Sequence, residues 1–388
     1  MKRLLSLFVI SSLLFTPQAN AVPKKPVVKP LTLLATVGSA DEFAGLVVSG
    51  KTIVVYGNKG DKSFAKALDL TGKELWTLEL DKASPSVATA ATVDSSGNIW
   101  LAGSTSLARA TPTPSPSASV LNPDKTIPIA EIFNADLDAF SLWSLNPTTQ
   151  ALAQYTLQLS APILINSIAE AKNGITAVGS SGTIINADVA GGISKPIVIG
   201  TESTVFESVV KNTDGSLTVV GSSSETLGGK KLVGKVDGVI IKISKVGRLV
   251  SVVRSSEPKA SRKWLSATNS FLLGGEVITG PKVESAVTKF SRTYVPSWTY
   301  RFASTGKTFT AGSSFAFFQS KGGVTQLANW APKNPQALLL SFDAQGVITA
   351  GYSAPAQQRE VLGFFVSKDL GPLCITSSAE TVSIYTLN

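Results

Sequence analysis

The sequence predicts an all-β protein in which seven similar four-stranded units close into a ring. Three observations predict it. A short strand pattern that ends in glycine recurs along the chain, a five-residue turn recurs at intervals of roughly 50 residues, and the last unit lacks a strand that the N-terminal part of the chain can supply. Sustained 3.6-residue periodicity of apolar residues, which marks amphipathic helices, is scarce.

The strand pattern is a run of β-branched and other apolar residues that ends in glycine. Turn residues often precede it, such as the Asn-Gly pair at 173–174 and the Asp-Gly pair at 214–215, which supply the positive φ angles of tight hairpins. Each copy predicts one short strand of a unit. The copies lie at 52–57, 98–103, 175–179, 217–221 and 271–275.

The second marker is a strand end followed by a five-residue turn and another strand-like run. One long gap between copies holds two units, of which one is degenerate near Ile193, and another gap holds one unit plus an insertion. A unit count of six would result if the degenerate unit is not formed. The turns are predicted at 68–72, 145–149, 243–247, 290–294 and 342–346.

The two chain ends complement each other. Leu387 and Asn388 match the start of the turn, so the last unit lacks its final strand, whereas the strand-like run at 31–37 has no unit of its own. We therefore predict a seven-bladed β-propeller of four-stranded antiparallel blades, in which the N-terminal strand joins the C-terminal blade and leaves no free edge between first and last. A β-sandwich is the alternative. The units are expected near 43–80, 87–157, 163–199, 204–254, 262–301, 309–352, and 360–388 with 31–38.

The segment 65–76, Ala-Lys-Ala-Leu-Asp-Leu-Thr-Gly-Lys-Glu-Leu-Trp, resembles the blade repeat of secreted bacterial quinoprotein-type β-propellers. Weaker copies extend the resemblance over most of the chain. It implies the propeller fold. The quinone enzymes of that family have eight blades and use an acid and calcium ligands that cannot be placed in this sequence, so we predict no cofactor.

The residue inventory excludes several chemistries. The 388-residue chain has no histidine, one cysteine and one methionine, and its formal charge is +9. Without histidine, a Ser–His–Asp triad, a Cys–His pair and a histidine metal site are excluded, and a single cysteine excludes an internal disulfide. Met1 is the only methionine, which excludes methionine ligation of haem. Cys374 lies in a strand pattern, so we expect a buried, inert thiol.

The N-terminus has the pattern of a secretory signal peptide. Lys2 and Arg3 precede an apolar run over 4–15, and a small-x-small cleavage pattern ends at Ala21. The apolar run is shorter than the roughly 20 residues that span a bilayer, which disfavours the alternative of a membrane anchor. We predict a signal peptide at 1–21 and a protein that is secreted or held at the cell envelope, with no transmembrane anchor after cleavage.

Two segments are rich in proline. Residues 22–30 predict an extended, solvated Pro/Lys linker ahead of a propeller domain at 31–388. The linker serves as a spacer or as a weak tether to polyanions. The insertion at 106–134 is rich in Pro, Ser and Thr and predicts a loop between the second and third strands of its blade, either a tolerated insertion or a glycosylated spacer. The tether lysines would be Lys24, Lys25 and Lys29.

Candidate site residues follow from the loops that a propeller presents on one face. Trp330 lies in a loop and is expected either to contact a ligand or to cap a blade edge. The acidic residues near such loops could hydrolyse a glycosidic bond if two of them converge, but the sequence favours turn caps that accept backbone N–H groups. The stretch 134–138 lacks the Gly and Glu of a helical calcium loop, so no metal site is predicted. The acids are Asp61, Asp136, Asp138, Glu225, Asp237 and Glu284, and Asp61, Asp138 and Asp237 join Trp330 as predicted ligand contacts.

The sequence thus favours a secreted or cell-surface propeller that acts as a non-enzymatic binding or scaffolding module. Its expected partner is a protein or polysaccharide of the cell envelope, with no nucleic acid, and a monomer is expected. The alternative is a propeller enzyme of the hydrolase or quinoprotein type that uses carboxylates in the central pocket. A third possibility is a structural module that binds copies of itself. The sequence does not identify the ligand.

Overall fold

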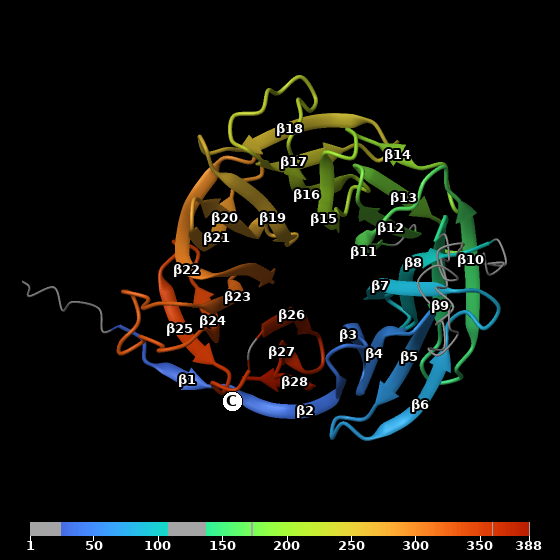
Figure 1. The fold of residues 1–388 in the computed structure, drawn as a ribbon, viewed down its shortest axis with the longest axis horizontal. Coiled ribbons are helices and arrows are strands. Elements are labelled where there is room, and N and C mark those ends of the chain that lie inside the picture. The colour runs from blue at the N-terminus through green and yellow to red at the C-terminus, as the bar shows by residue number, and fades with distance from the viewer. Residues whose placement is uncertain (1–24, 108–136, 172–173, 359, 388) are drawn as a thin grey trace, which may run out of the picture.

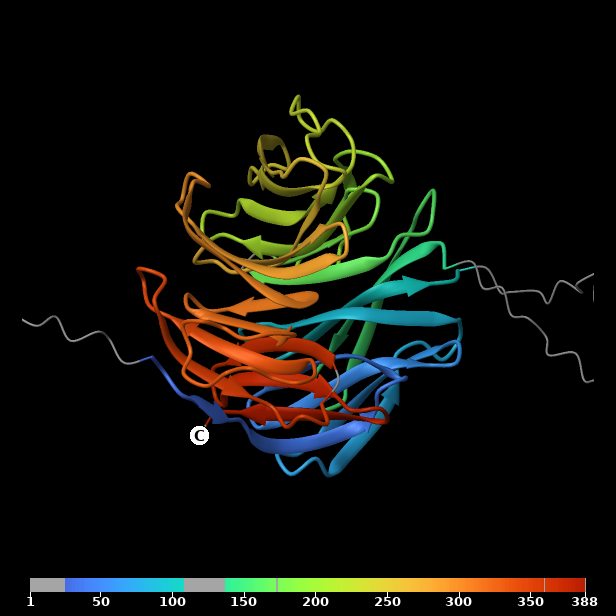
Figure 2. The ribbon, with the colours of Figure 1, turned by 60° about the vertical axis from the view of Figure 1, so that its left-hand side comes forward.

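The computed structural model describes residues 25–107, 137–171, 174–358 and 360–387, and all of its regular structure is β-strand. The predicted signal peptide, Lys24, Asp136 and most of the insertion lie outside the described residues. The strands form six hydrogen-bonded sheets arranged in a ring, seen down its axis in Figure 1 and obliquely in Figure 2.

Four sheets follow one another along the first two thirds of the chain. In each, four antiparallel strands succeed one another in chain order, with the first strand nearest the ring axis and the fourth at the rim (Figure 1). Their strands are β3 (Phe43–Ser49), β4 (Thr52–Lys59), β5 (Lys62–Leu68) and β6 (Glu74–Glu79); β7 (Ser86–Val93), β8 (Ile99–Thr105), β9 (Ala139–Leu145) and β10 (Leu152–Gln158); β11 (Ile165–Ala171), β12 (Gly174–Gly179), β13 (Thr183–Ala187) and β14 (Ile197–Val198); β15 (Thr204–Lys211), β16 (Leu217–Ser223), β17 (Asp237–Ile243) and β18 (Leu249–Ser255).

The fifth sheet has eight strands and joins two of the predicted units. Strand β22 runs over 16 residues without a turn; residues 296–303 pair with β21, and residues 304–311 pair with β23. The chain therefore forms six separate sheets where seven separate units were predicted. The strands are β19 (Ser261–Ala267), β20 (Leu272–Thr279), β21 (Lys282–Phe290), β22 (Pro296–Ala311), β23 (Phe315–Ser320), β24 (Gln336–Phe342), β25 (Ile348–Ser353) and β1 (Val28–Pro30).

The sixth sheet closes the ring with both ends of the chain. It contains β26 (Glu360–Ser367), β27 (Gly371–Ser377), β28 (Thr381–Thr386) and β2 (Thr32–Ser39), and β2 pairs antiparallel with β28. Figure 2 shows β2 beside the C-terminal strands. The prediction that the N-terminal strand completes the C-terminal blade is confirmed.

The linker expectation is wrong for the part nearest the ring. Residues 28–30 are extended, but they form β1, which pairs in parallel with β25 at the rim. The amide of Ala328 also donates to the carbonyl of Pro26 at 2.8 Å, and that of Leu31 donates to the carbonyl of Ser353 at 2.9 Å. Residues 28–31 therefore lie along the edge of the eight-stranded sheet, where they pair with backbone groups of β25 that would otherwise have no strand partner.

A bulge in the innermost strand explains why the strand pattern ends in glycine. In the first five units the inner strand carries one extra residue, as between Ala88 and Ala90. The bulge turns a backbone carbonyl toward the second strand, and a Cβ at Gly103 would overlap the carbonyl oxygen of Val87. Only glycine leaves room for this approach. The same contact occurs at Gly57, Gly103, Gly179, Gly221 and Gly275.

The other ends of the strands are joined by a repeated turn, and we call this side the turn face. Among the described residues, eight turns share two hydrogen bonds: the first residue's N–H donates to the fifth carbonyl, and the fourth N–H donates to the first carbonyl. In seven of them a side-chain oxygen of the first residue also accepts backbone N–H groups. Four of the five predicted turns are among them. At the fifth, predicted at 145–149, the chain forms a longer turn in which the N–H of Asn146 donates to the carbonyl of Ala151. The degenerate unit has its own five-residue turn at 188–192. The first residues of the eight turns are Asp69, Asp94, Asp188, Asn212, Ser244, Thr268, Ser291 and Asp343.

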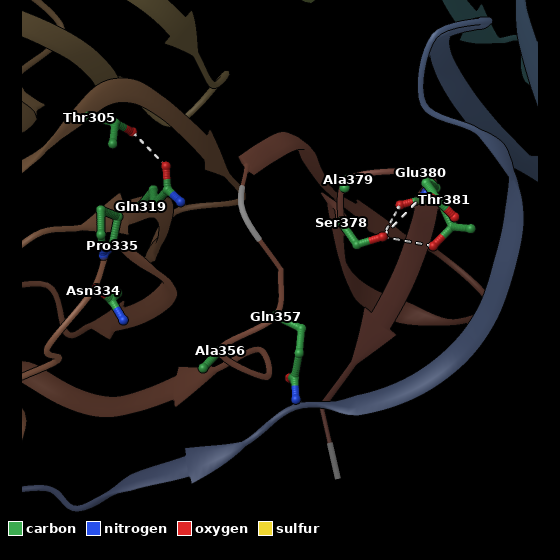
Figure 3. Close-up of a pocket in the computed structure, with 10 residues that line it drawn as sticks. All are labelled: Thr305, Gln319, Asn334, Pro335, Ala356, Gln357, Ser378, Ala379, Glu380 and Thr381. Carbon is green, nitrogen blue, oxygen red and sulfur yellow. Dashed lines mark hydrogen bonds between the residues drawn. The ribbon is translucent and has the colours of Figure 1, made fainter.

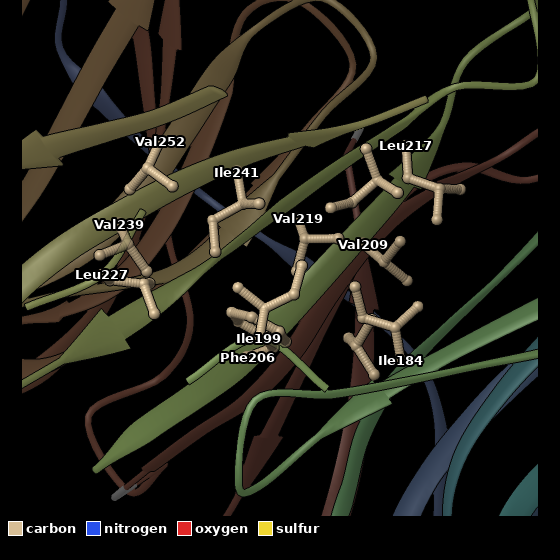
Figure 4. Close-up of a cluster of buried hydrophobic side chains, with 12 residues drawn as sticks. Ile184, Ile199, Phe206, Val209, Leu217, Val219, Leu227, Val239, Ile241 and Val252 are labelled. Carbon is tan, nitrogen blue, oxygen red and sulfur yellow. The ribbon is translucent and has the colours of Figure 1, made fainter. Parts of the chain in front are cut away.

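The core lies between neighbouring sheets. Figure 4 shows the cluster between the third and fourth sheets, where Ile184, Val219 and Ile241 are completely buried. Burial of such side chains stabilises the ring by about 1.5–3 kcal/mol each. Trp143 and Trp264 are also completely buried, as expected for core anchors, and the buried Cys374 fits the expected inert thiol, because burial raises its pKa well above its ordinary value.

Hydrogen bonds from side chains also join adjacent sheets. The amide of Ala88 donates to Oδ1 of Asn58 at 2.8 Å, and Nδ2 of Asn166 donates to the carbonyl of Phe206 at 2.9 Å. These bonds link the first sheet to the second and the third to the fourth. Because they satisfy backbone groups of the inner strands, they fix the spacing of the sheets around the ring axis.

Candidate functional site

The side opposite the turn face carries the candidate site, and we call it the loop face. Here the second strand of each unit leads into the third, and each unit leads into the next. Its connections vary from tight hairpins, as between β4 and β5, to long irregular loops, as between β16 and β17 or β23 and β24. The insertion leaves the ring on this face, between β8 and β9, as predicted.

A pocket of about 760 Å³ opens on the loop face between the eight-stranded sheet and the closing sheet (Figure 3). One side comes from β22, β23 and the β23–β24 loop, and the other from the segment between β25 and β26 and from the β27–β28 connection with the first residue of β28. Among the described residues that line it, the polar groups are amides and hydroxyls, and Glu380 alone is charged. They come from Thr305, Gln319, Asn334, Gln357, Ser378 and Thr381.

Hydrogen bonds hold some of these groups in place and leave others available. Oγ1 of Thr305 donates to Oε1 of Gln319 at 3.0 Å, and Ser378 and Thr381 join their hydroxyls at 3.0 Å. The side chains of Asn334 and Gln357 are exposed and form no hydrogen bond with any described residue. Each amide can therefore offer two N–H donors and a carbonyl acceptor to a ligand.

The pocket lies where the glycine pattern ends. In β23, Gln319 and Ser320 occupy the place that glycine holds in the first five units, and in β27 Thr376 does so. The inner strand facing Gln319 has a three-residue bulge at 305–307 instead of a single extra residue, which makes room for a long side chain. Sequence reasoning missed Gln319, although the loss of glycine from the repeat was a usable signal.

Asp237 has the structural role that the sequence favoured. Its carboxylate is completely buried and accepts N–H groups of Val233 and Gly234 at 3.0 and 2.9 Å. Arg254 lies 3.2 Å away as its ion-pair partner. Burial alone would raise the pKa of Asp237, but the two backbone donors, Ser256 and the charge of Arg254 together hold that pKa below its ordinary value. The side chain therefore fixes the β16–β17 loop.

The other predicted ligand contacts are not among the residues that line the pocket. Oδ2 of Asp138 accepts from Nε2 of Gln158 at 2.7 Å, and Asp61 is exposed between β4 and β5. Trp330 is half-buried and packs at the rim of the hydrophobic cluster that contains Leu327. Among the described residues, no hydrogen bond or ion pair joins any two of the predicted contacts, which belong to four different units. Their ligand roles stay predictions.

The remaining predicted acids are engaged in local contacts. Oε1 of Glu225 accepts from the amide of Thr201 and from the Thr204 hydroxyl, both at 2.7 Å. Glu284 lies 2.7 Å from Lys282 and 3.7 Å from Arg301. Both carboxylates therefore hold the loop face together.

The two described tether lysines are exposed: Lys29 lies in β1 at the rim, and Lys25 lies three residues before that strand. Lys24 lies outside the described residues. The described ranges contain no group of three or more Asp, Glu, Cys or His residues placed to hold a metal ion. They also contain no helix long and apolar enough to cross a membrane.

Comparison with known proteins defines the class of the fold. No protein-family model matches the chain, and no curated protein matches it. Among solved structures, the chain is similar to the crystal structure of RRP9 WD40 repeats, with a TM-score of 0.57 and 9% sequence identity over 94% of this chain and 99% of that one. At this identity the similarity shows the fold alone: the protein is a β-propeller of four-stranded antiparallel blades.

Proposed function

We propose that the protein is an exported, non-enzymatic binding module whose loop-face pocket binds a polysaccharide of the cell envelope. The observation that carries the proposal is the pocket of neutral amides and hydroxyls between the eight-stranded and closing sheets. Sugar hydroxyls both donate and accept hydrogen bonds, so they match the free amides of Asn334 and Gln357. The carboxylate of Glu380 adds one strong hydrogen-bond acceptor to the pocket lining.

The ring supplies a rigid support for such a site. We infer that the eight-stranded sheet works as two blades that share β22, which gives seven blades in total. Support comes from the bulge at 305–307, since an inner-strand bulge also marks each of the other units. Many propellers present loops for binding and carry no catalytic group, so the fold agrees with this function without requiring it. The likeness of 65–76 to quinoprotein repeats bears on the fold alone.

The exported location rests on the sequence pattern of residues 1–21. Its test is cell fractionation followed by determination of the N-terminal residue of the mature protein. Cleavage after Ala21 and recovery outside the cytoplasm are the expected result. Recovery of the uncleaved chain in the cytoplasm would contradict it.

A second candidate function is the hydrolysis of glycosidic bonds, which one carboxylic acid, Glu207, favours. Glu207 is the bulge residue of β15, and burial raises its pKa, which the nearby charge of Glu276 raises further and that of Lys263 lowers. A carboxylic acid with a raised pKa is the form that a glycosidase uses to protonate a leaving group. Sequence reasoning missed these inner-strand charges because it looked for acids in loops.

The proposed binding function is tested by isothermal titration calorimetry of the protein with isolated envelope polysaccharide. Replacement of both amides, Asn334→Ala with Gln357→Ala, should weaken binding about tenfold, because two direct hydrogen-bonding groups are lost. The control is Gln345→Ala, an exposed glutamine on the turn face.

Equal binding by the double variant and the control would overturn the pocket assignment. Assay of reducing ends in the same samples separates the two functions. Release of sugar that Glu207→Gln abolishes would favour the hydrolase.

A further inference from the structure

A second pocket, of about 930 Å³, lies on the turn face between the third and fourth sheets. It is lined by the end of β13 and the residues after it, by the β15–β16 turn and by the β17–β18 turn. In an antiparallel unit, the connections from first to second and third to fourth strand leave at one end, and the connection from second to third at the other. The two pockets therefore lie on opposite faces of the ring.

The pocket exists because the third sheet has a shortened outer strand. β14 has two residues, which pair with Thr183 and Ile184 at the loop-face end of β13, whereas β10 and β18 have seven residues each. At the turn-face end no full strand covers β13. The space left there has an apolar floor of Ile197 and Leu217. Leu217 belongs to the cluster in Figure 4, and Ile197 packs against that cluster.

Three lysines from three separate segments line this space. Nζ of Lys211 is half-buried and donates to the carbonyl of Gly174 at 3.0 Å, and the charge of Glu170 acts on it. Lys195 and Lys245 are exposed, and neither lies within ion-pair distance of a carboxylate among the described residues. Two ammonium groups are thus free to bind a ligand.

Two carboxylates also line the pocket, and both are engaged in turns. Oδ1 of Asp188 accepts the amides of Ala190 and Gly192 at 2.8 and 2.9 Å. Oδ1 of Asp214 accepts the amide and the hydroxyl of Ser216 at 2.9 and 2.6 Å. Lys242, next to the pocket, adds a further positive charge near Asp214. Three lysines and two carboxylates thus line the pocket, so the charge of this lining is +1, and Lys195 and Lys245 are its exposed cations.

The geometry points to a binding site for an oligoanion, a ligand that carries at least two phosphate or carboxylate groups along one molecule. Lys195 and Lys245 would each bind one anionic group, and the apolar floor would contact the backbone of the ligand between them. Lysine ammonium groups bind phosphate and carboxylate as point charges, so either group fits. Because this site faces away from the loop-face pocket, an acidic polymer and the polysaccharide can bind together.

The test measures binding of two probes to the whole protein: inorganic tripolyphosphate and a short oligogalacturonate. Removal of the two free charges, Lys195→Gln with Lys245→Gln, should weaken binding at least about tenfold. The matched control is Lys51→Gln with Lys368→Gln, which changes the net charge equally at two exposed lysines of other units and should change affinity by about twofold at most.

The results decide the proposal and the source of the ligand. Preferential loss of tripolyphosphate binding in the Lys195/Lys245 variant supports a phosphate-bearing ligand, and preferential loss of oligogalacturonate binding supports an acidic polysaccharide. Equal weakening in both double variants would mean that only net charge acts and would overturn the site. Absence of binding by either probe to the unsubstituted protein would also overturn it. Thermal melting of all variants checks that each is folded.

Discussion

The turn face and the loop face of this ring are held by different means. On the turn face, exposed or half-buried residues such as Asp343 accept N–H groups within their own five-residue turn. On the loop face, buried carboxylates bind segments that are distant in sequence. Asp81, for example, accepts the Thr105 hydroxyl at 2.9 Å and the amide of Gln154 at 2.8 Å.

The difference shows how a repeat protein separates stability from recognition. A local turn needs only its own five residues, so it can recur in each unit without regard to the neighbours. A buried carboxylate needs partners from several segments, so each one is particular to its place. Irregular loops with particular contacts are also where a ring can differ from unit to unit and present a binding site.

The largest expected effect comes from breaking the buried ion pair of the loop face. Asp237→Asn leaves the buried charge of Arg254 without its carboxylate partner, which should destabilise the protein by about 3–5 kcal/mol. Urea unfolding at pH 7 measures the change. Addition of Arg254→Met should recover part of the loss, because the unpaired charge is then removed.

The pH dependence of stability provides the control for this variant. Because the native pKa of Asp237 is lowered, its ionised form stabilises the fold above about pH 4, the ordinary Asp value, and this contribution is lost as the pH falls through the native pKa. The difference between the unsubstituted protein and Asp237→Asn should therefore narrow in acid. A constant difference down to about pH 2 would contradict the assignment.

The next largest effect is expected at the inner-strand bulge, which packs against a glycine of the second strand. Unlike the buried ion pair, this feature recurs from unit to unit. Gly103→Ala places a methyl group on the carbonyl of Val87, and the required backbone shift should destabilise the fold by about 1–3 kcal/mol. Gly322→Ala is the control, because a Cβ there meets only an ordinary contact with Ala303, and its effect should stay within about 0.5 kcal/mol. Equal melting temperatures for the two variants would show that the bulge relaxes freely.

What could be predicted from the sequence follows the same division. The turns and the glycine-ended strands were predicted because each geometry depends on one or two residue types at fixed spacing, as in 342–346. The closing role of the N-terminal strand was predicted because a unit lacked its last strand. The turn of the third unit was missed as a regular element, although Asp188 and Gly191 fit the pattern of its relatives.

Apart from this closing strand, features that depend on distant partners could not be predicted. The continuation of β22 from one unit into the next depends on pairing with both β21 and β23. The docking of residues 28–30 depends on the free edge of β25. The loop-face pocket depends on side chains separated by some 50 residues or more, such as Gln319 and Thr381, which only the folded ring brings together. The sequence identified Asp237 as an acidic residue near a loop, but it did not show that Val233, Gly234 and Arg254 are the partners of its carboxylate.

A smaller effect is expected from a single turn of the turn face. Oδ1 of Asn146 accepts the amides of Thr148 and Thr149, at 3.0 and 2.9 Å, and its Nδ2 donates to Asn98. Asn146→Ala should destabilise the protein by about 1 kcal/mol, as loss of local hydrogen bonds does. Thr148→Ala, which removes an exposed side chain from the same turn, should have almost no effect in the same urea titration. A loss as large as that of Asp237→Asn would remove the distinction between the faces.

The smallest stability effect is expected at the candidate site itself. Asn334 is the same residue type as Asn146, but its side chain is exposed in the loop-face pocket and forms no hydrogen bond with a described residue. Asn334→Ala should therefore change the free energy of unfolding by less than about 0.5 kcal/mol. If Asn334→Ala weakens polysaccharide binding without a loss of stability, the Asn334 amide serves recognition and is not required by the fold. A stability loss equal to that of Asn146→Ala would instead place Asn334 among the structural residues and remove it from the binding site.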